Sequence, residues 1–129
     1  MDIFLLKLES VLEIHAYQLG AYGGIAGTRD QALLESAVAM PAAMFAGQYL
    51  HRDIFEMAAA YLFHLVKNHP FLDGNKRVGA GAAATFLRMN GIRMTASNGE
   101  FADLTLEVAR GNADKPVIAQ FFRDNFRPV

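Results

Sequence analysis

A short segment with reactive side chains separates two strongly apolar stretches of the chain. It reads HPFLDGNKRVG and runs from His69 to Gly79. His69 can exchange a proton near neutral pH, and Asp73 is a hard oxygen ligand of the kind that Mg²⁺ prefers. Basic side chains that suit phosphate oxygens come directly after them. A base, a metal ligand and a phosphate-binding group together favour phosphoryl or nucleotidyl transfer.

The second half of this segment falls where a helix is expected to begin. Gly74, Asn75 and Lys76 should therefore present unpaired backbone N–H groups beside the positive end of the helix dipole. Such a helix start is a ready anion site. Asn75 adds an amide donor, while Lys76 and Arg77 add positive charge. We expect nucleotide phosphates to bind here.

Apolar periodicity predicts an all-α fold around this segment. The expected helices cover about 3–19, 32–40, 53–67, 75–90, 97–110 and a last stretch from 114 onward. Capping-box spacing precedes three of them, in the pairs Thr28 and Gln31, Asp53 and Glu56, and Ser97 and Glu100. Residues 41–52 lack a clear period and are predicted to form an irregular loop or a small hairpin. No strand is expected elsewhere.

Two local features concern the central pair of helices. Pro70 disfavours helical geometry at His69, so the third helix should stop there. Gly79 and Gly81 lie inside the fourth helix, where each glycine costs about 1 kcal/mol relative to alanine. Close approach of another helix explains these glycines best.

Composition indicates one domain over residues 1–129 and excludes several classes of protein. The net charge of −1 gives no electrostatic footprint for direct nucleic-acid binding. The absence of cysteine excludes disulfides and thiolate metal sites. No apolar run is long enough to span a membrane, and the start of the chain does not read as a secretory signal. We expect a cytoplasmic protein with no membrane partner.

The stretch HPFLDGNKR resembles the signature of the Fic/Doc superfamily, which reads His, any residue, Phe, any residue, Asp or Glu, Gly or Ala, Asn, Gly or Lys, Arg. Every position fits. The stretches YGGIAGTRDQALLESAV and FLRMNG are similar to the death-on-curing (Doc) branch of that family. This resemblance implies a compact six-helix bundle with the motif loop between its two central helices.

The resemblance also implies roles for the residues of the loop. His69 would be the general base acting on a hydroxyl of a target protein, and Asp73 would hold Mg²⁺. The anion hole would comprise Gly74, Asn75 and Lys76, and Arg77 would pair with nucleotide phosphates.

Two positions separate this chain from the Fic adenylyltransferases. Lys76 replaces their usual Gly, and Ala80 stands where many of them have a second Arg. Both are features of the Doc branch, whose activity is phosphorylation of translation elongation factor Tu. The expected function is a toxin-like protein kinase of a type II toxin–antitoxin system, using ATP and Mg²⁺ and inhibiting translation.

Other functions stay open on the residues alone. The same site could transfer AMP, and the same fold could serve as a non-enzymatic binding module. A helix-turn-helix regulator is disfavoured by the charge balance. The Fic inhibitory helix motif is missing, since Ser10 leads to Ile14 rather than to Glu. By resemblance, control would come from a cognate antitoxin whose disordered tail folds on an exposed apolar strip of the toxin.

The remaining expectations concern residues outside the motif. Gly47, Gln48 and Tyr49 lie in the 41–52 segment, which we expect to act as a flap that holds the target chain by main-chain hydrogen bonds. A passive connection is an equally acceptable interpretation of that segment. Three other imidazoles are assigned structural or surface roles, namely His15, His51 and His64.

Overall fold

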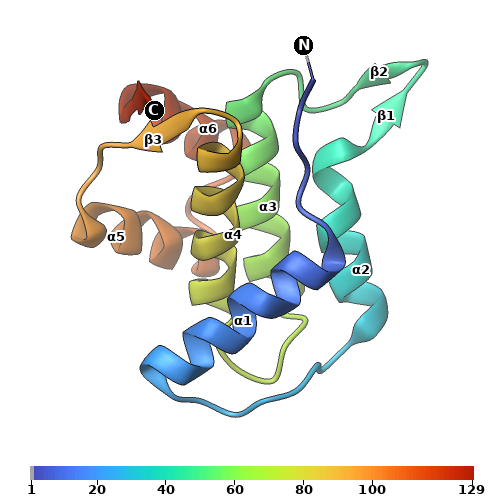
Figure 1. The fold of residues 1–129 in the computed structure, drawn as a ribbon, viewed down its shortest axis with the longest axis vertical. Helices are drawn as coiled ribbons and strands as arrows, with labels where there is room; N and C mark the ends of the chain where they lie inside the picture. The colour runs from blue at the N-terminus through green and yellow to red at the C-terminus, as the bar shows by residue number, and fades with distance from the viewer. Residues whose placement is uncertain (1) are drawn as a thin grey trace.

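The computed structural model describes residues 2–129 as a bundle of helices, which confirms the all-α fold class. Figure 1 shows α3 and α4 side by side at the centre, with α2 on one side, α5 and α6 on the other, and α1 crossing α4. The helices are α1 (Leu8–Tyr22), α2 (Gln31–Ala39), α3 (Ile54–Asn68), α4 (Asn75–Met89), α5 (Asn98–Ala109) and α6 (Lys115–Asp124). A short 3₁₀ turn comes after α2 at Met40–Ala42.

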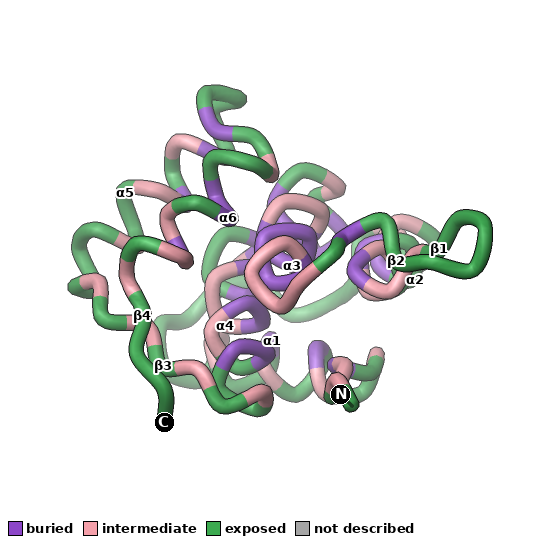
Figure 2. The backbone as a smooth tube through the Cα atoms, turned by 90° about the horizontal axis from the view of Figure 1, so that it is seen from above, coloured by how far each residue is buried: buried purple, intermediate pink, exposed green. Residues whose placement is uncertain are grey.

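Helix α3 is the core of the bundle. Its middle, Met57–Leu62, is completely enclosed, and Leu65 and Val66 continue the buried surface. This surface leads towards the motif loop, residues 69–74, which joins α3 to α4. In Figure 2 this helix is largely purple and is surrounded by the other helices. Burial of that apolar surface is the main force that holds the bundle together. The end of α3 is therefore a rigid support for the motif loop.

The glycines of α4 lie at helix contacts, as predicted. A Cβ at Gly79 would stand 2.8 Å from Val66 Cγ2 and 3.2 Å from the Leu62 carbonyl oxygen, both on α3. A Cβ at Gly81 would stand 3.0 Å from Ile14 Cγ2 on α1. Without these two glycines, neither α3 nor α1 could pack so closely against α4.

Most helix ends agree with the local signals in the sequence. Asp53 and Ser97 cap α3 and α5 through the backbone N–H groups of Glu56 and Glu100. α3 ends just before His69, also as predicted. The prediction for α2 was wrong in its cap: the Asp30 carboxylate accepts the Leu33 N–H, whereas Thr28 forms a β-bridge to the motif loop.

The first helix begins later than predicted, at Leu8 rather than near residue 3. The residues before it are extended because distant side chains pair with their backbone. The Phe4 N–H and carbonyl bond the Asn90 amide, and the Leu6 N–H donates to the Tyr61 hydroxyl at 2.9 Å. These tertiary bonds outweigh the local helical period of the segment.

A small antiparallel sheet was not predicted. It pairs β3 (Ile92–Met94) with β4 (Phe126–Pro128), with Arg93 opposite Arg127. Each strand has three residues, which is too few for an alternating pattern to stand out. The pairing depends on the chain bringing these distant segments together.

The segment before α3 forms the small hairpin that the sequence allowed. Its strands are β1 (Met44–Phe45) and β2 (Gln48–Tyr49), with Ala46 and Gly47 at positive φ in the turn. All four strand residues are exposed. The hairpin leads into the N-terminal end of α3, while the motif loop leaves the C-terminal end of that helix (Figure 1).

Candidate active site

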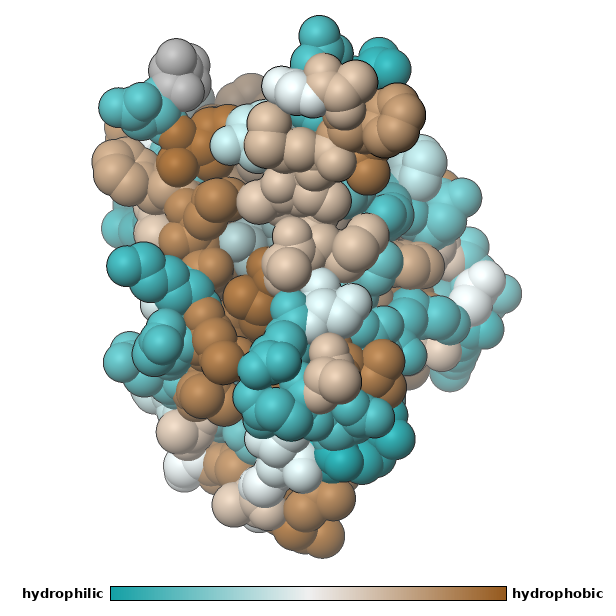
Figure 3. Space-filling model, turned by 90° about the vertical axis from the view of Figure 1, so that its right-hand side faces the viewer, coloured by the Kyte–Doolittle hydropathy of each residue, from teal (hydrophilic) through white to brown (hydrophobic). Residues whose placement is uncertain are grey.

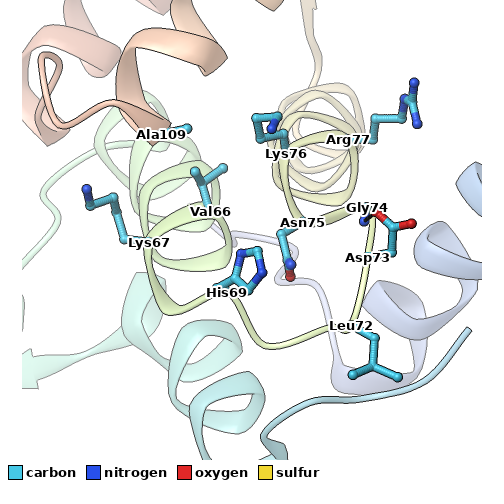
Figure 4. A pocket seen from close by; sticks show the side chains of 10 residues that line it. All are labelled: Val66, Lys67, His69, Leu72, Asp73, Gly74, Asn75, Lys76, Arg77 and Ala109. Atoms are coloured by element: carbon cyan, nitrogen blue, oxygen red, sulfur yellow. Dashed lines mark hydrogen bonds between the residues drawn. The ribbon is translucent and has the colours of Figure 1, made fainter. Parts of the chain in front are cut away.

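The motif loop forms one side of a cleft of about 590 Å³ between the end of α3 and the start of α4 (Figure 4). Ala109, at the end of α5, also contributes to its wall. Every residue predicted to be catalytic, metal-binding or phosphate-binding lines this cleft: His69, Asp73, Gly74, Asn75, Lys76 and Arg77. The structure therefore brings together in space what the motif brings together in sequence.

His69 is held in an unusual backbone conformation. Its φ of 50° and ψ of 52° place it in the left-handed region, which few residues other than glycine adopt. The residue is exposed, and Figure 4 shows its ring in the cleft near Asn75. No side chain or backbone group within residues 2–129 makes a hydrogen bond to that ring. Both ring nitrogens are thus without a partner among the described residues.

Helix α4 presents its free N–H groups to the cleft. The first intrahelical bond runs from the Val78 N–H to the Gly74 carbonyl, and no acceptor within residues 2–129 meets the N–H groups of Asn75, Lys76 or Arg77. The Gly74 N–H is already used, since it donates to Asp73 Oδ1 at 2.9 Å. The free N–H groups at this helix start are therefore those of residues 75–77, an arrangement that suits an anion, and Gly74 contributes the left-handed turn that begins the helix.

The side chain of Asn75 is tied into the loop, whereas the sequence suggested a wholly free amide donor. It is buried, and its Oδ1 accepts the Phe71 N–H at 2.9 Å while its Nδ2 donates to the Phe71 carbonyl at 3.0 Å. A buried loop backbone needs such partners, because unpaired polar groups are costly away from water. The Asn75 amide thus closes the loop, which leaves its backbone N–H and one hydrogen of Nδ2 without an assigned acceptor.

Asp73 is an ionised carboxylate at the edge of the cleft. Hydrogen bonds from the Ile25 and Gly74 N–H groups, together with the positive charge of Arg77, hold the pKa of Asp73 below its usual range. The Ile25 N–H reaches Oδ2 at 3.1 Å. Because a carboxylate offers about four lone-pair sites, each oxygen keeps the capacity to bind a cation. This donor chemistry fits Mg²⁺, although residues 2–129 contain no group of three or more His, Cys, Asp or Glu able to form a complete metal site.

The two basic residues after Asn75 lie on α4 at the cleft rim. Lys76 and Arg77 are both exposed. The Arg77 guanidinium carbon lies 4.6 Å from the centre of the Tyr22 ring on α1, which is a cation–π contact. Figure 4 shows Arg77 pointing away from His69, so its charge lies on the far side of the helix start.

The connection between α1 and α2 supports the motif loop, a role that was not predicted. Thr28 and Phe71 form an antiparallel bridge, and the Leu72 N–H donates to the Gly27 carbonyl at 3.0 Å. Gly24 has a φ of 127°, which favours glycine, and a Cβ there would stand 2.9 Å from Asp73 Oδ2. The several glycines of YGGIAGTRD were the signal that could have revealed this close approach.

The other histidines have different surroundings. His15 is buried against the loop, with its ring on Phe71, so it belongs to the support of the site. His51 and His64 instead approach the Lys115 ammonium at the start of α6. Neither lines the cleft.

The predicted flap does not reach the cleft. Gly47, Gln48 and Tyr49 belong to the exposed hairpin at the opposite end of α3 from His69 (Figure 1). A helix of 15 residues is about 22 Å long, so the hairpin is separated from the imidazole by about that distance. The segment 41–52 therefore does not adjoin the cleft, and its role in holding a target chain stays a prediction. The segment that does lie beside the motif loop is residues 24–30, in the connection between α1 and α2.

Comparison with known proteins agrees with the motif and the fold. A family model described as the Fic/DOC family matches residues 5–87. The chain is 41% identical over 101 residues to "Toxin Doc" of Mycolicibacterium smegmatis, which covers 77% of this chain and 78% of that protein. It is 33% identical over 115 residues to "Protein kinase doc" of Escherichia phage P1, covering 89% and 90% of the two chains. Within residues 2–129, no helix has the length and apolar character to cross a membrane. The complete motif, the helical bundle around it and these matches together show that the chain belongs to the Fic/DOC family.

Proposed function

We propose that this protein is the toxin of a type II toxin–antitoxin pair and that it transfers the γ-phosphate of ATP to a hydroxyl of a target protein. One observation carries the proposal: three free N–H groups at the start of α4 share a cleft with an unpaired imidazole, among residues 2–129. The names of two relatives, Toxin Doc and Protein kinase doc, support the same assignment.

The positions of these groups support the following reaction. His69 removes the proton of the target hydroxyl, and the hydroxyl oxygen forms a bond to the γ-phosphorus of ATP. The bond between the γ-phosphorus and the oxygen that bridges it to the β-phosphate breaks, which releases ADP. The N–H groups of residues 75–77 stabilise the negative charge on the transferring group. Lys76 and Arg77 add positive charge at the cleft rim. Catalysis consists of positioning and charge stabilisation.

A divalent cation fits this site through one protein ligand. Asp73 would hold Mg²⁺, with phosphate and water completing its coordination. The cation would neutralise charge on the phosphates of ATP.

Two residues of α4 favour transfer of phosphate rather than AMP. Lys76 adds bulk and charge to the groove, and Ala80 offers no cation for a terminal phosphate. Ala80 instead lines an apolar pocket together with Ala102 and Leu106. ATP then binds with its γ-phosphate at the start of α4.

Translation elongation factor Tu is the proposed target by resemblance to the Doc branch.

Labelled nucleotide tests this function. Purified protein is incubated with Mg²⁺ and a bacterial lysate, using ATP labelled on either the γ- or the α-phosphate. We expect label from the γ-position only, and none with His69→Ala. Label from the α-position only would mean AMP transfer, and no label from either would favour a non-enzymatic binding module. Mass spectrometry of the labelled protein would identify the target.

The proposal includes a cognate antitoxin and a cytoplasmic location. Figure 3 shows apolar residues gathered in a strip that runs down the left-hand part of this face. Phe4 and Leu12 are large apolar side chains exposed on the N-terminal segment and α1. A disordered antitoxin tail that folds on such a strip would bury apolar surface as it orders. Co-expression with the neighbouring gene product should yield a complex, and a host that tolerates the protein alone at high expression would contradict the proposal.

A further inference from the structure

The position of the His69 ring depends on its main chain. The ring makes no hydrogen bond within residues 2–129, so nothing but the backbone and the χ angles fixes where the nitrogens lie. That backbone is left-handed, a conformation that is strained for a residue with a Cβ. Such a conformation persists only when its surroundings determine it.

Arg29 provides those surroundings. Its Nε donates to the His69 carbonyl oxygen at 2.7 Å, and its Nη2 donates to the Asn68 carbonyl oxygen at 2.9 Å. These carbonyls close the C-terminal end of α3, where a positive charge is also favoured by the helix dipole. The planar fork of the guanidinium matches two adjacent acceptors, which the single ammonium of lysine cannot do.

Arg29 is itself held on both sides. Its own N–H donates to the Pro70 carbonyl at 2.7 Å, and the Asp30 N–H reaches the same oxygen at 3.0 Å. Asp30 is the cap of α2, so the guanidinium extends from the rigid start of a helix. The contact thus ties α2 to the turn that carries the imidazole.

We infer that Arg29 is a positioning residue that fixes the left-handed turn at His69 and so aims its imidazole into the cleft. The inference rests on the proposed function for its effect on catalysis, but the effect on the turn is independent of it. Arg29 is not among the residues that line the cleft. Its loss should therefore lower kcat while changing the KM for ATP by less than about twofold.

The experiment compares Arg29→Ala and Arg29→Lys with Arg93→Ala, an exposed arginine on β3, as the control. We expect kcat of Arg29→Ala to fall by up to about 100-fold, because a displacement near 1 Å has that effect on catalysis. Arg29→Lys should be intermediate, and added guanidinium ion should restore part of the rate to Arg29→Ala. The kcat of Arg93→Ala should equal that of the parent protein.

A second measurement does not depend on activity. In Arg29→Ala, NMR should show faster amide exchange at Phe71 and Leu72, whose N–H groups are bonded in the loop, and altered ring shifts at His69. Unchanged exchange and shifts, or an unchanged kcat, would overturn the role of Arg29. If the parent protein transfers no phosphate, the proposed function fails and the NMR result alone decides the inference. Should Arg29→Ala not fold, Arg29→Lys carries both measurements.

Discussion

The imidazole of His15 lies parallel to the ring of Phe71, with 3.8 Å between the ring centroids and 9° between the planes. His15 Nε2 donates to the Asp73 carbonyl oxygen at 2.9 Å, so the proton is on that nitrogen. One side chain of α1 thus holds two points of the motif loop. His15 thus contacts Phe71 and Asp73, whereas Arg29 bonds the chain where the loop begins, at Asn68 and His69.

Two substitutions of His15 should distinguish the contribution of the ring stack to stability from that of the hydrogen bond. His15→Ala loses both and leaves a cavity, so we expect the free energy of unfolding to fall by about 2–3 kcal/mol. His15→Phe keeps the stack and should cost about 1 kcal/mol, because only the Asp73 carbonyl loses its partner. Urea unfolding measures both. Equal losses in the two variants would contradict a stabilising stack.

Replacement of His69 by glycine should stabilise the fold and abolish activity. Glycine adopts the left-handed conformation without strain, so we expect a gain of about 0.5–1 kcal/mol in the free energy of unfolding. Transfer should fall by about 10²-fold or more through loss of the base. Lys67→Gly is the matched control, because that exposed residue is helical and should lose about 1 kcal/mol. A loss of stability in His69→Gly would argue against backbone strain at the site.

The cluster around Lys115 predicts a pH dependence of stability. The Lys115 ammonium donates to Nε2 of His51 at 3.1 Å and of His64 at 3.2 Å, so both imidazoles must be neutral. Burial, the charge of Lys115 and the proximity of His51 lower the pKa of His64 from 6.5 to about 4. Burial and Lys115 also lower the pKa of His51, against an opposing effect of Glu56.

Because these pKa values are lowered in the folded state, the unfolded chain binds more protons as the pH falls from about 6.5 to about 4. The free energy of unfolding should therefore decrease through that window and be fully retained above it. Urea midpoints measured across the window should decline less steeply for His64→Gln, which can still accept from Lys115. If the urea midpoints of the parent protein and of His64→Gln declined equally with pH, His64 would be ruled out as the cause.

The glycines of α4 and α1 should respond to alanine in opposite directions. Gly79→Ala places a methyl group against Val66 and the Leu62 carbonyl, so we expect a loss of about 1–3 kcal/mol in the free energy of unfolding. Gly20→Ala on α1 meets nothing within 4 Å and should gain up to about 1 kcal/mol from helix propensity. Thermal or urea unfolding measures both. A stable Gly79→Ala protein would show that α3 and α4 can separate at little cost.

The sequence by itself determined the features that depend on near neighbours in the chain. The caps at Asp53 and Ser97, the end of α3 before Pro70 and the start of α4 after Gly74 each depend on a few adjacent residues. The motif is also local, and so the residues that line the cleft could be predicted together.

Only the tertiary structure decided which partners these residues have. Arg29 and His15 reach the motif loop across 40 and 58 positions of the chain, and no periodicity reports such contacts. The Asn75 amide was assigned to a ligand because its type suits phosphate, and the structure shows that it also bonds the buried Phe71 backbone. The 41–52 segment was assigned to the site from its irregular pattern, whereas the length of α3 places it at the other end of the molecule. Local chemistry selects the reactive groups, and packing between distant segments sets where they lie.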